Sequence, residues 1–129
     1  MQQVGVDIIE INRIEKAISR WGDNFLKRVY TDSELKLYRD RSASLAVRFS
    51  GKEAVIKALG SDNIYLHDIE IVPDEFGKPQ VMLSGRAQQT AEDMGMKNLS
   101  ISLSHCREYA VAFVVGEIHP VGGIPPNAQ

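Results

Sequence analysis

An alternation of apolar residues and serines near the C-terminus restricts how this chain can fold more than any other feature does. The segment "LSISLSH" at residues 99–105 places Leu99, Ile101 and Leu103 on one side of an extended chain and three serines on the other. A period of two is that of a β-strand with one buried face. The triplet "CRE" follows, and then the apolar run "YAVAFVV" at residues 109–115. We therefore expect an antiparallel hairpin whose apolar face is covered by another layer of the protein.

Three further segments have the composition of β-strands. The first, "QVGVDII" at residues 3–9, is rich in β-branched side chains. The other two, "HDIEIV" at 67–72 and "QVMLS" at 80–84, flank the sequence "PDEFGKP". Glycine and proline between two such runs are typical of a turn that joins two strands. The sequence thus predicts a second hairpin in addition to the C-terminal one.

Two helices are expected within the first forty residues. Apolar residues recur at helical spacing in Ile11, Ile14, Ile18 and Trp21. The segment "TDSE" at 31–34 is a capping box, in which Thr31 caps a helix and Glu34 reaches back to the cap. A short polar helix should therefore begin directly after Thr31.

Two more helices are expected further along the chain. The first should begin at a cap on Ser42 or Ser44, run to Leu59 and end at Gly60. The segment "RAQQTAEDMG" at 86–95 predicts another, shorter helix. Strands that mostly follow one another as hairpins, with helices packed on them, indicate an α+β fold with an antiparallel sheet.

Length and composition favour one globular domain. The chain has 129 residues, of which 43% are hydrophobic, which is enough to form one compact hydrophobic core. We assign residues 1–118 to this single domain, because the segment 119–129 is rich in glycine and proline and is expected to be a loose tail.

Several classes of protein do not fit this composition. No run approaches the roughly 18 apolar residues of a membrane-spanning helix, and the first residues do not resemble a secretory signal. The single cysteine, Cys106, excludes a disulfide within the chain. The net charge is −2, and the sequence lacks the basic clusters interleaved with aromatic residues that are typical of nucleic-acid binders. We therefore expect a cytoplasmic protein with neither nucleic acid nor membrane as its partner.

Charge is nevertheless distributed unevenly along the chain. The first 60 residues contain 11 Lys and Arg against 8 Asp and Glu, whereas the remainder contains 4 against 9. An anionic partner would be attracted to the basic half.

A glutamate interrupts the apolar stripe of the long central helix. On a helical wheel with Phe49 at zero, Leu45 lies at roughly −40°, Ile56 at roughly −20° and Glu53 at roughly +40°. The side of the helix that we expect to be buried therefore includes a carboxylate. Burying an unpaired carboxylate is costly, so Glu53 should meet a cation, a metal ion or a wet cleft.

Asp7 poses the same question, because it lies within the apolar run of the first strand. It could simply accept backbone N–H groups where the strand meets the first helix. Glu53 could form an ion pair with Lys57, although such an exposed pair contributes only roughly 0.3–0.5 kcal/mol. Alternatively, Asp7 and Glu53 together could bind Mg²⁺, while Lys52 and Lys57 contact phosphate oxygens. Two acids beside two lysines favour a diphosphate site.

Four ordered segments resemble those of a known enzyme family. They are "VGVDIIEINRI" at 4–14, "RFSGKEAVIKALG" at 48–60, "DIEIVPDEFGKPQV" at 68–81 and "SISLSHCREYAVAFVV" at 100–115. Together they resemble the signature segments of the holo-[acyl-carrier-protein] synthases, the small 4′-phosphopantetheinyl transferases. The resemblance covers roughly residues 4–116, which is nearly the whole chain.

This resemblance implies a reaction and a set of site residues. Enzymes of the family transfer the 4′-phosphopantetheine arm of coenzyme A to a serine of an acyl carrier protein, release adenosine 3′,5′-bisphosphate and require Mg²⁺. By motif position, Asp7 and Glu53 would bind the metal, and with Lys57 they would form the catalytic group. The residues expected to contact the coenzyme are Arg48, Lys52, Lys57, Ser104 and His105.

Two points of chemistry stay open. The serine proton could leave to Glu53 or to a hydroxide bound to the metal. His105 closes a strand before a turn, and it could simply form a local hydrogen bond instead of approaching the 3′-phosphate of coenzyme A.

The resemblance also implies macromolecular partners. The carrier protein is acidic, and Arg13, Lys16 and Arg20 recur on one side of the first helix. We expect Arg13 and Arg20 to face the carrier protein, although a solvated basic helix face would show the same spacing. Members of the family form homotrimers with active sites shared between neighbouring subunits, so the same assembly is implied here.

Two other functions compete with the transferase. A non-catalytic binding module could recognise coenzyme A or an acidic partner, but it would not need both Asp7 and Glu53. An Mg²⁺-dependent nucleotide hydrolase would need a glycine-rich phosphate loop of the Walker type, which the sequence lacks.

Overall fold

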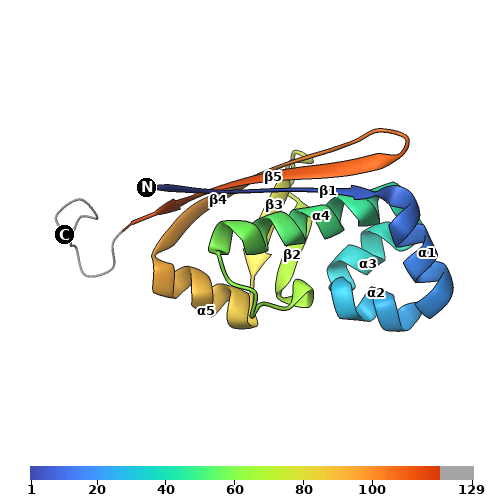
Figure 1. Cartoon of the computed structure of the whole chain (residues 1–129), viewed down its shortest axis with the longest axis horizontal. Helices are drawn as coiled ribbons and strands as arrows, with labels where there is room; N and C mark the ends of the chain where they lie inside the picture. Colours follow the sequence, from blue (N-terminus) through green and yellow to red (C-terminus); the bar gives the residue numbers. More distant parts are fainter. Residues whose placement is uncertain (120–129) are drawn as a thin grey trace.

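A computed structural model describes residues 1–119 of the chain (Figure 1). It contains two antiparallel sheets and a set of helices, which confirms the predicted α+β class. In chain order the elements are β1 (Gln2–Glu10), α1 (Ile11–Trp21), α2 (Asp23–Val29), α3 (Asp32–Tyr38), α4 (Ser42–Leu59), the 3₁₀ turn η1 (Leu66–Asp68), β2 (Ile69–Pro73), β3 (Pro79–Leu83), α5 (Gly85–Met94), β4 (Met96–His105) and β5 (Tyr109–Ile118).

The larger sheet has the strand order β1-β5-β4, and all of its pairs are antiparallel. Figure 1 shows the helices on one side of this sheet, with α4 lying along it. Gly5 permits this close packing, because a Cβ atom there would lie 1.9 Å from the backbone oxygen of Ala54. The predicted C-terminal hairpin is confirmed, with Ile101 buried against the core and the serines of β4 on the opposite, exposed face.

The predicted second hairpin is also confirmed, as the two-stranded sheet β2-β3. Strand β2 begins at Ile69, because residues 66–68 form the single turn η1. Ile69 and Ile71 point into the core that α4 shares with α5 and β4. The hairpin therefore packs on a different side of α4 from β1.

The capping box at Thr31 is confirmed in both of its arms. The backbone N–H of Glu34 donates to Thr31 Oγ1 at 3.3 Å, and the backbone N–H of Thr31 donates to Glu34 Oε1 at 2.9 Å. The sequence did not predict α2, which follows a break at Gly22 with φ of 55°. The predicted serine cap of α4 is wrong, since Arg41 occupies the cap position without a side-chain hydrogen bond.

The predicted buried stripe of α4 is confirmed at Leu45, which is fully buried, but Phe49 and Ile56 are covered only in part. The sheet, the β2-β3 hairpin and the neighbouring helices bury this helix on nearly all sides. Beyond its first turn, the part of α4 left open consists of Phe49, Glu53 and Ile56, which are half-buried, and Lys57, which is exposed. From Phe49 onward, the side on which Glu53 lies is thus the least covered side of α4.

Within residues 1–119, no helix combines the length and the apolar character needed to cross a bilayer. Of the predicted tail, only His119 belongs to the described residues, and positions 120–129 lie outside them.

Candidate active site

Asp7 and Lys57 meet on the flank of α4 that faces β1. Lys57 Nζ lies 3.2 Å from Asp7 Oδ1 and donates a hydrogen bond of 2.9 Å to the backbone oxygen of Val6. Asp7 is mostly covered, with 19% of its side chain exposed, whereas Lys57 is 55% exposed. The ammonium group is therefore anchored on β1 at one end of an open surface.

Glu53 lies one helical turn before Lys57 and joins the same group. Burial and the neighbouring charge of Asp7 raise the pKa of Glu53, and the attraction of Lys57 offsets this only in part. No residue in the range 1–119 donates a hydrogen bond to its carboxylate. The structure thus places two carboxylates close enough to repel each other, with the oxygens of Glu53 free to bind a further group.

The chemistry of these donors suits Mg²⁺. The two acids supply oxygen ligands only, which is what this cation prefers. Residues 1–119 contain no cluster of three or more His, Cys, Asp and Glu side chains that could enclose a metal ion. A site with two protein carboxylates leaves coordination positions for water and for substrate phosphates, as is usual for Mg²⁺.

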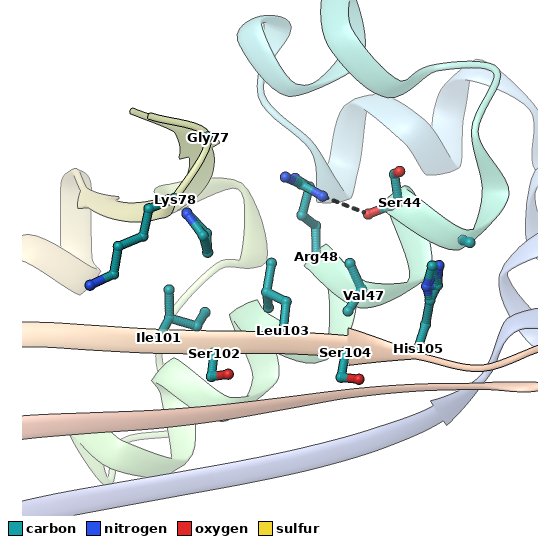
Figure 2. Close-up of a pocket in the computed structure, with 12 residues that line it drawn as sticks. Ser44, Val47, Arg48, Gly77, Lys78, Ile101, Ser102, Leu103, Ser104 and His105 are labelled. Atoms are coloured by element: carbon teal, nitrogen blue, oxygen red, sulfur yellow. Dashed lines mark hydrogen bonds between the residues drawn. The ribbon is translucent and has the colours of Figure 1, made fainter. Parts of the chain in front are cut away.

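A second candidate region is a cavity of about 460 Å³ on the other flank of α4 (Figure 2). One wall is the first half of α4, the second is the tip of the β2-β3 hairpin and the third is the end of β4. The residues that line it are Ala43, Ser44, Val47, Arg48, Gly77, Lys78, Pro79, Ile101, Ser102, Leu103, Ser104 and His105. The region therefore brings together Arg48, Ser104 and His105, three of the residues that the sequence analysis assigned to the coenzyme.

Arg48 is held rigidly at the wall of this cavity. Its Nε donates to the backbone oxygen of Ile71 at 3.0 Å, and its two terminal nitrogens donate to the Ser44 carbonyl and the Tyr38 hydroxyl. The guanidinium group also lies over the Tyr38 ring, 3.7 Å from its centre. Burial lowers the pKa of Arg48, although a guanidinium group remains charged at neutral pH.

His105 and Ser104 differ in how they face the cavity. Figure 2 shows the ring of His105 on the cavity side of β4, whereas the hydroxyl of Ser104 points to the opposite side of the strand. No hydrogen bond joins the His105 ring to another residue of the described range 1–119. Lys78 adds a second cation to the cavity that the sequence analysis did not assign.

Lys52 is not part of either region. Its side chain is fully buried and forms an ion pair of 2.7 Å with Glu34, which is fully buried too. The ammonium group also donates to the backbone oxygens of Leu66 and Ile69, so its three donors are all used. The structure contradicts the prediction of a phosphate contact by Lys52, because an enclosed and saturated ammonium group cannot reach a ligand.

The acid pair and the cavity do not meet within one chain. Glu53 and Arg48 are five positions apart on α4, which separates their directions by about 140° around the helix axis. Asp7 belongs to β1 and His105 to β4, the two outer strands of the larger sheet. Apart from Lys52 and the two arginines of α1, the predicted site residues therefore form two groups on different flanks of α4, which we name the first half-site (Asp7, Glu53 and Lys57) and the second half-site (the cavity with Arg48 and His105).

The predicted partner face is exposed. Arg13 and Arg20 are both solvent-accessible on α1, and the guanidinium of Arg20 lies 5.0 Å from the ring centre of Trp21. Trp21 was expected in the apolar stripe of α1 but is 55% exposed. It lines a cavity of about 490 Å³ with Asn24, Phe25 and Arg28. Helical spacing alone placed Trp21 in the core. The arginines near it in the sequence were the signal for a surface position that the sequence analysis missed.

Comparison with known proteins decides the family. The family model for the 4′-phosphopantetheinyl transferase superfamily matches residues 3–114. A holo-[acyl-carrier-protein] synthase of Dehalococcoides mccartyi (strain CBDB1) is 52% identical over 118 residues, which cover 91% of this chain and 99% of that protein. The chain belongs to the holo-[acyl-carrier-protein] synthase family of 4′-phosphopantetheinyl transferases. The resemblance of the four sequence segments is thereby confirmed.

Solved structures of 4′-phosphopantetheinyl transferases share the fold. The holo-[acyl-carrier-protein] synthase of Helicobacter pylori, solved in complex with coenzyme A, is 35% identical with a TM-score of 0.80, and the match covers 88% of this chain and 99% of that one. The holo-ACP-synthase of Plasmodium yoelii is 30% identical with a TM-score of 0.81, covering 92% and 95%. The fold of this transferase is therefore that of its family over nearly its whole described length.

Proposed function

We propose that this chain transfers the 4′-phosphopantetheine arm of coenzyme A to a serine hydroxyl of an apo acyl carrier protein, with Mg²⁺ bound by Asp7 and Glu53. The observation on which the proposal rests is the group of Asp7, Glu53 and Lys57 on one flank of α4. Membership of the transferase family supports the same reaction. Because coenzyme A is an intracellular metabolite, we place the reaction in the cytoplasm.

The proposed reaction exchanges one phosphorus–oxygen bond for another. The serine oxygen attacks the phosphorus that bears the pantetheine arm, and the bond from that phosphorus to the second phosphate breaks. Adenosine 3′,5′-bisphosphate leaves with the electron pair of the broken bond, and the serine proton passes to a base. Phosphoryl transfer of this kind depends mainly on positioning and on neutralising charge.

The residues of the first half-site fit these requirements. Lys57, fixed by Val6 and Asp7, would stabilise the negative charge that develops on the departing phosphate. The carboxylate of Glu53, which accepts no hydrogen bond from another residue of the range 1–119, could receive the serine proton. When bound between the acids, Mg²⁺ would act as a Lewis acid on the diphosphate of coenzyme A.

The second half-site fits the nucleotide end of coenzyme A. Its cavity presents Arg48, Lys78 and His105, three groups that can each donate a hydrogen bond to a phosphate oxygen. We propose that Arg48 and His105 contact the coenzyme there, as the family motifs imply. Ser104 would take part through its backbone, since its hydroxyl lies on the other side of β4.

The separation of the two half-sites supports a homotrimer with shared active sites. Within one chain the cavity and the acid pair lie on different flanks of α4, and a neighbouring copy would bring a cavity beside the acid pair. The outer face of the larger sheet, opposite the helices, exposes Val4, Val6, Ile8, Tyr109 and Phe113. An apolar face of this kind is typical of a protein interface. A cyclic arrangement of three copies would repeat the same contact between the acid pair of one subunit and the cavity of the next.

The basic face of α1 supports docking of the carrier protein. Arg13 and Arg20 are free to contact an acidic surface, and Trp21 offers an apolar anchor beside them. Charge complementarity of this kind accelerates the encounter of two proteins and orients them.

The reaction is tested by mixing the protein with coenzyme A, Mg²⁺ and an apo carrier protein. Intact mass spectrometry should show the phosphopantetheine arm on the carrier, and chromatography should show an equal amount of adenosine 3′,5′-bisphosphate. Both products should be lost when EDTA removes the metal. Binding of coenzyme A without transfer to any of several carriers would instead support a binding module.

A further inference from the structure

Three backbone groups on one edge of β2 are bound by side chains instead of by a neighbouring strand. The other edge of β2 pairs with β3. On the free edge, Lys52 Nζ donates to the Ile69 oxygen, and Arg48 Nε donates to the Ile71 oxygen at 3.0 Å. The Ile71 N–H donates to Glu34 Oε2 at 2.7 Å. Side chains of α3 and α4 thus take the place of a third strand.

Lys52 and Glu34 form the centre of this network. Their charged atoms are 2.7 Å apart, and neither side chain is exposed. Glu34 Oε1 also accepts the N–H of Thr31, so the capping box of α3 belongs to the same network. The remaining donor of Lys52 binds the Leu66 oxygen in η1, just before β2. The pair therefore fixes β2 and the turn before it to both helices.

The network leads directly to the cavity beside α4. Strand β2 continues into the hairpin tip, where Gly77, Lys78 and Pro79 form one wall of the cavity (Figure 2). Arg48 belongs to the opposite wall and, through its bond to Ile71, also to the network. Lys52 and Glu34 do not line the cavity, so any effect that they have on a ligand there must pass through β2.

We propose that Lys52 and Glu34 are positioning residues that set the distance between the two walls of the coenzyme A cavity. The proposal rests on the proposed function, because it takes coenzyme A as the ligand of this cavity. It assigns the lysine of the segment "SGKEA" a role in coenzyme affinity that involves no contact with the coenzyme. The hydrogen bonds of Lys52 and Glu34 would hold β2, and β2 would hold the hairpin tip in the binding geometry.

Two substitutions test this role. Lys52→Met keeps the length of the side chain but removes the ammonium group, and Glu34→Gln keeps the shape but places an amide where three donors converge. In each variant, the dissociation constant of coenzyme A measured by calorimetry should rise about tenfold or more, which corresponds to losing roughly one well-placed interaction. Affinity for the apo carrier protein should change less than about twofold, because Arg13 and Arg20 are exposed on α1 and form no hydrogen bond with the network.

A control variant separates positioning from general destabilisation. Ala91→Gly lowers the stability of α5, whose residue 91 is buried but lies outside the cavity lining. At a temperature at which all three variants remain folded, Ala91→Gly should bind coenzyme A as the unmodified protein does. Equal loss of affinity in the control, or unchanged affinity in Lys52→Met and Glu34→Gln, would overturn the proposal.

A measurement on the unmodified protein covers the case in which the variants do not fold. Amide hydrogen exchange should slow on addition of coenzyme A in peptides from the hairpin (residues 69–83) and also in the capping box at 31–34, since the network connects the two. Protection that stops at the cavity wall and leaves residues 31–34 unchanged would contradict coupling through β2. A protein that does not bind coenzyme A at all would contradict the proposed function as well, and transfer assays would then fail too.

Discussion

Lys57 Nζ and Asp7 Oδ1 lie 3.2 Å apart although 50 positions separate the two residues in the sequence. This contact joins the opening strand to the second half of α4 and brings Glu53 beside the same aspartate. Two acids and one lysine on an open flank are costly to assemble for stability alone, because the acids repel each other and exposed ion pairs contribute little. The arrangement is better explained by a ligand that carries both positive and negative charge, such as Mg²⁺ with a diphosphate.

Replacing Glu53 with glutamine should abolish transfer while the fold remains intact. The amide preserves the size of the side chain but is a poorer metal ligand and cannot accept the serine proton, so we expect the rate to fall by about 10³-fold or more. Transfer is measured by mass spectrometry, and circular dichroism serves as the control for folding. Undiminished activity would remove Glu53 from the mechanism.

The same substitution should stabilise the metal-free protein at neutral pH. Because the pKa of Glu53 is raised in the folded state, the folded protein binds this proton more tightly than the unfolded chain does. Stability from protonated Glu53 is therefore present at acidic pH and is lost as the pH rises through the folded-state pKa. At pH 7 in EDTA, Glu53→Gln should melt a few degrees higher than the unmodified protein, and the difference should shrink toward pH 4.

Metal binding should reverse the order of the two melting temperatures, so that the unmodified protein melts higher than Glu53→Gln. Mg²⁺ that binds only the folded state raises the melting temperature of the unmodified protein in proportion to its concentration, whereas Glu53→Gln should respond weakly. Differential scanning calorimetry with and without Mg²⁺ measures both effects. An equal response of the two proteins to Mg²⁺ would place the metal elsewhere.

Replacing Lys57 with methionine should reduce the rate more than the affinity for coenzyme A. The side chain is 55% exposed, so its loss should cost little stability, whereas the charge on the departing phosphate would go unneutralised. Removing one such stabilising donor typically costs about 10²- to 10³-fold in rate. Steady-state kinetics should therefore show a fall in kcat with a small change in KM for coenzyme A, and Lys57→Arg should restore part of the activity.

Arg13→Ala and Arg20→Ala should each weaken the binding of the carrier protein without changing the affinity for coenzyme A. Both side chains are exposed on α1, away from the cavity and the acid pair. The KM for the carrier should rise several-fold in each variant, and its dependence on salt should become shallower as one attractive charge is lost. Lys36→Ala, an exposed basic residue on α3, serves as the control. Equal effects on carrier and coenzyme would argue against docking on α1.

Much of the fold could be predicted because its elements carry local signals. These signals act over a few residues: they are the capping box at Thr31, the alternation in β4 and the glycines after the helices. The structure has the predicted element at each of them. The burial of α4 could not be predicted, since it depends on which distant strands pack around the helix. The apolar spacing of Phe49 and Ile56 marks a surface that a single chain leaves partly open.

The site was predicted unevenly for the same reason. Asp7 comes from the first signature segment and Glu53 and Lys57 from the second, and the structure brings the three together in space. Lys52 belongs to the same segment as Glu53 and Lys57, but its ion-pair partner Glu34 comes from a different helix. No local sequence pattern predicts that buried pair. A lysine next to the glutamate that we propose as a metal ligand therefore need not face the substrate.

A mixing experiment tests the shared active site directly. Glu53→Gln removes an acid from one half-site, and His105→Ala removes a group from the other, so each variant alone should be inactive or nearly so. If every site combines the acids of one subunit with the cavity of the next, mixed trimers will contain some sites with both halves intact. Random mixing of equal amounts in a cyclic assembly should restore about a quarter of the full activity. Light scattering should give the mass of a trimer for each variant and for the mixture. Mixtures that stay inactive after subunit exchange has been demonstrated would show that each chain builds its site alone, which the opposite directions of Glu53 and Arg48 on α4 argue against.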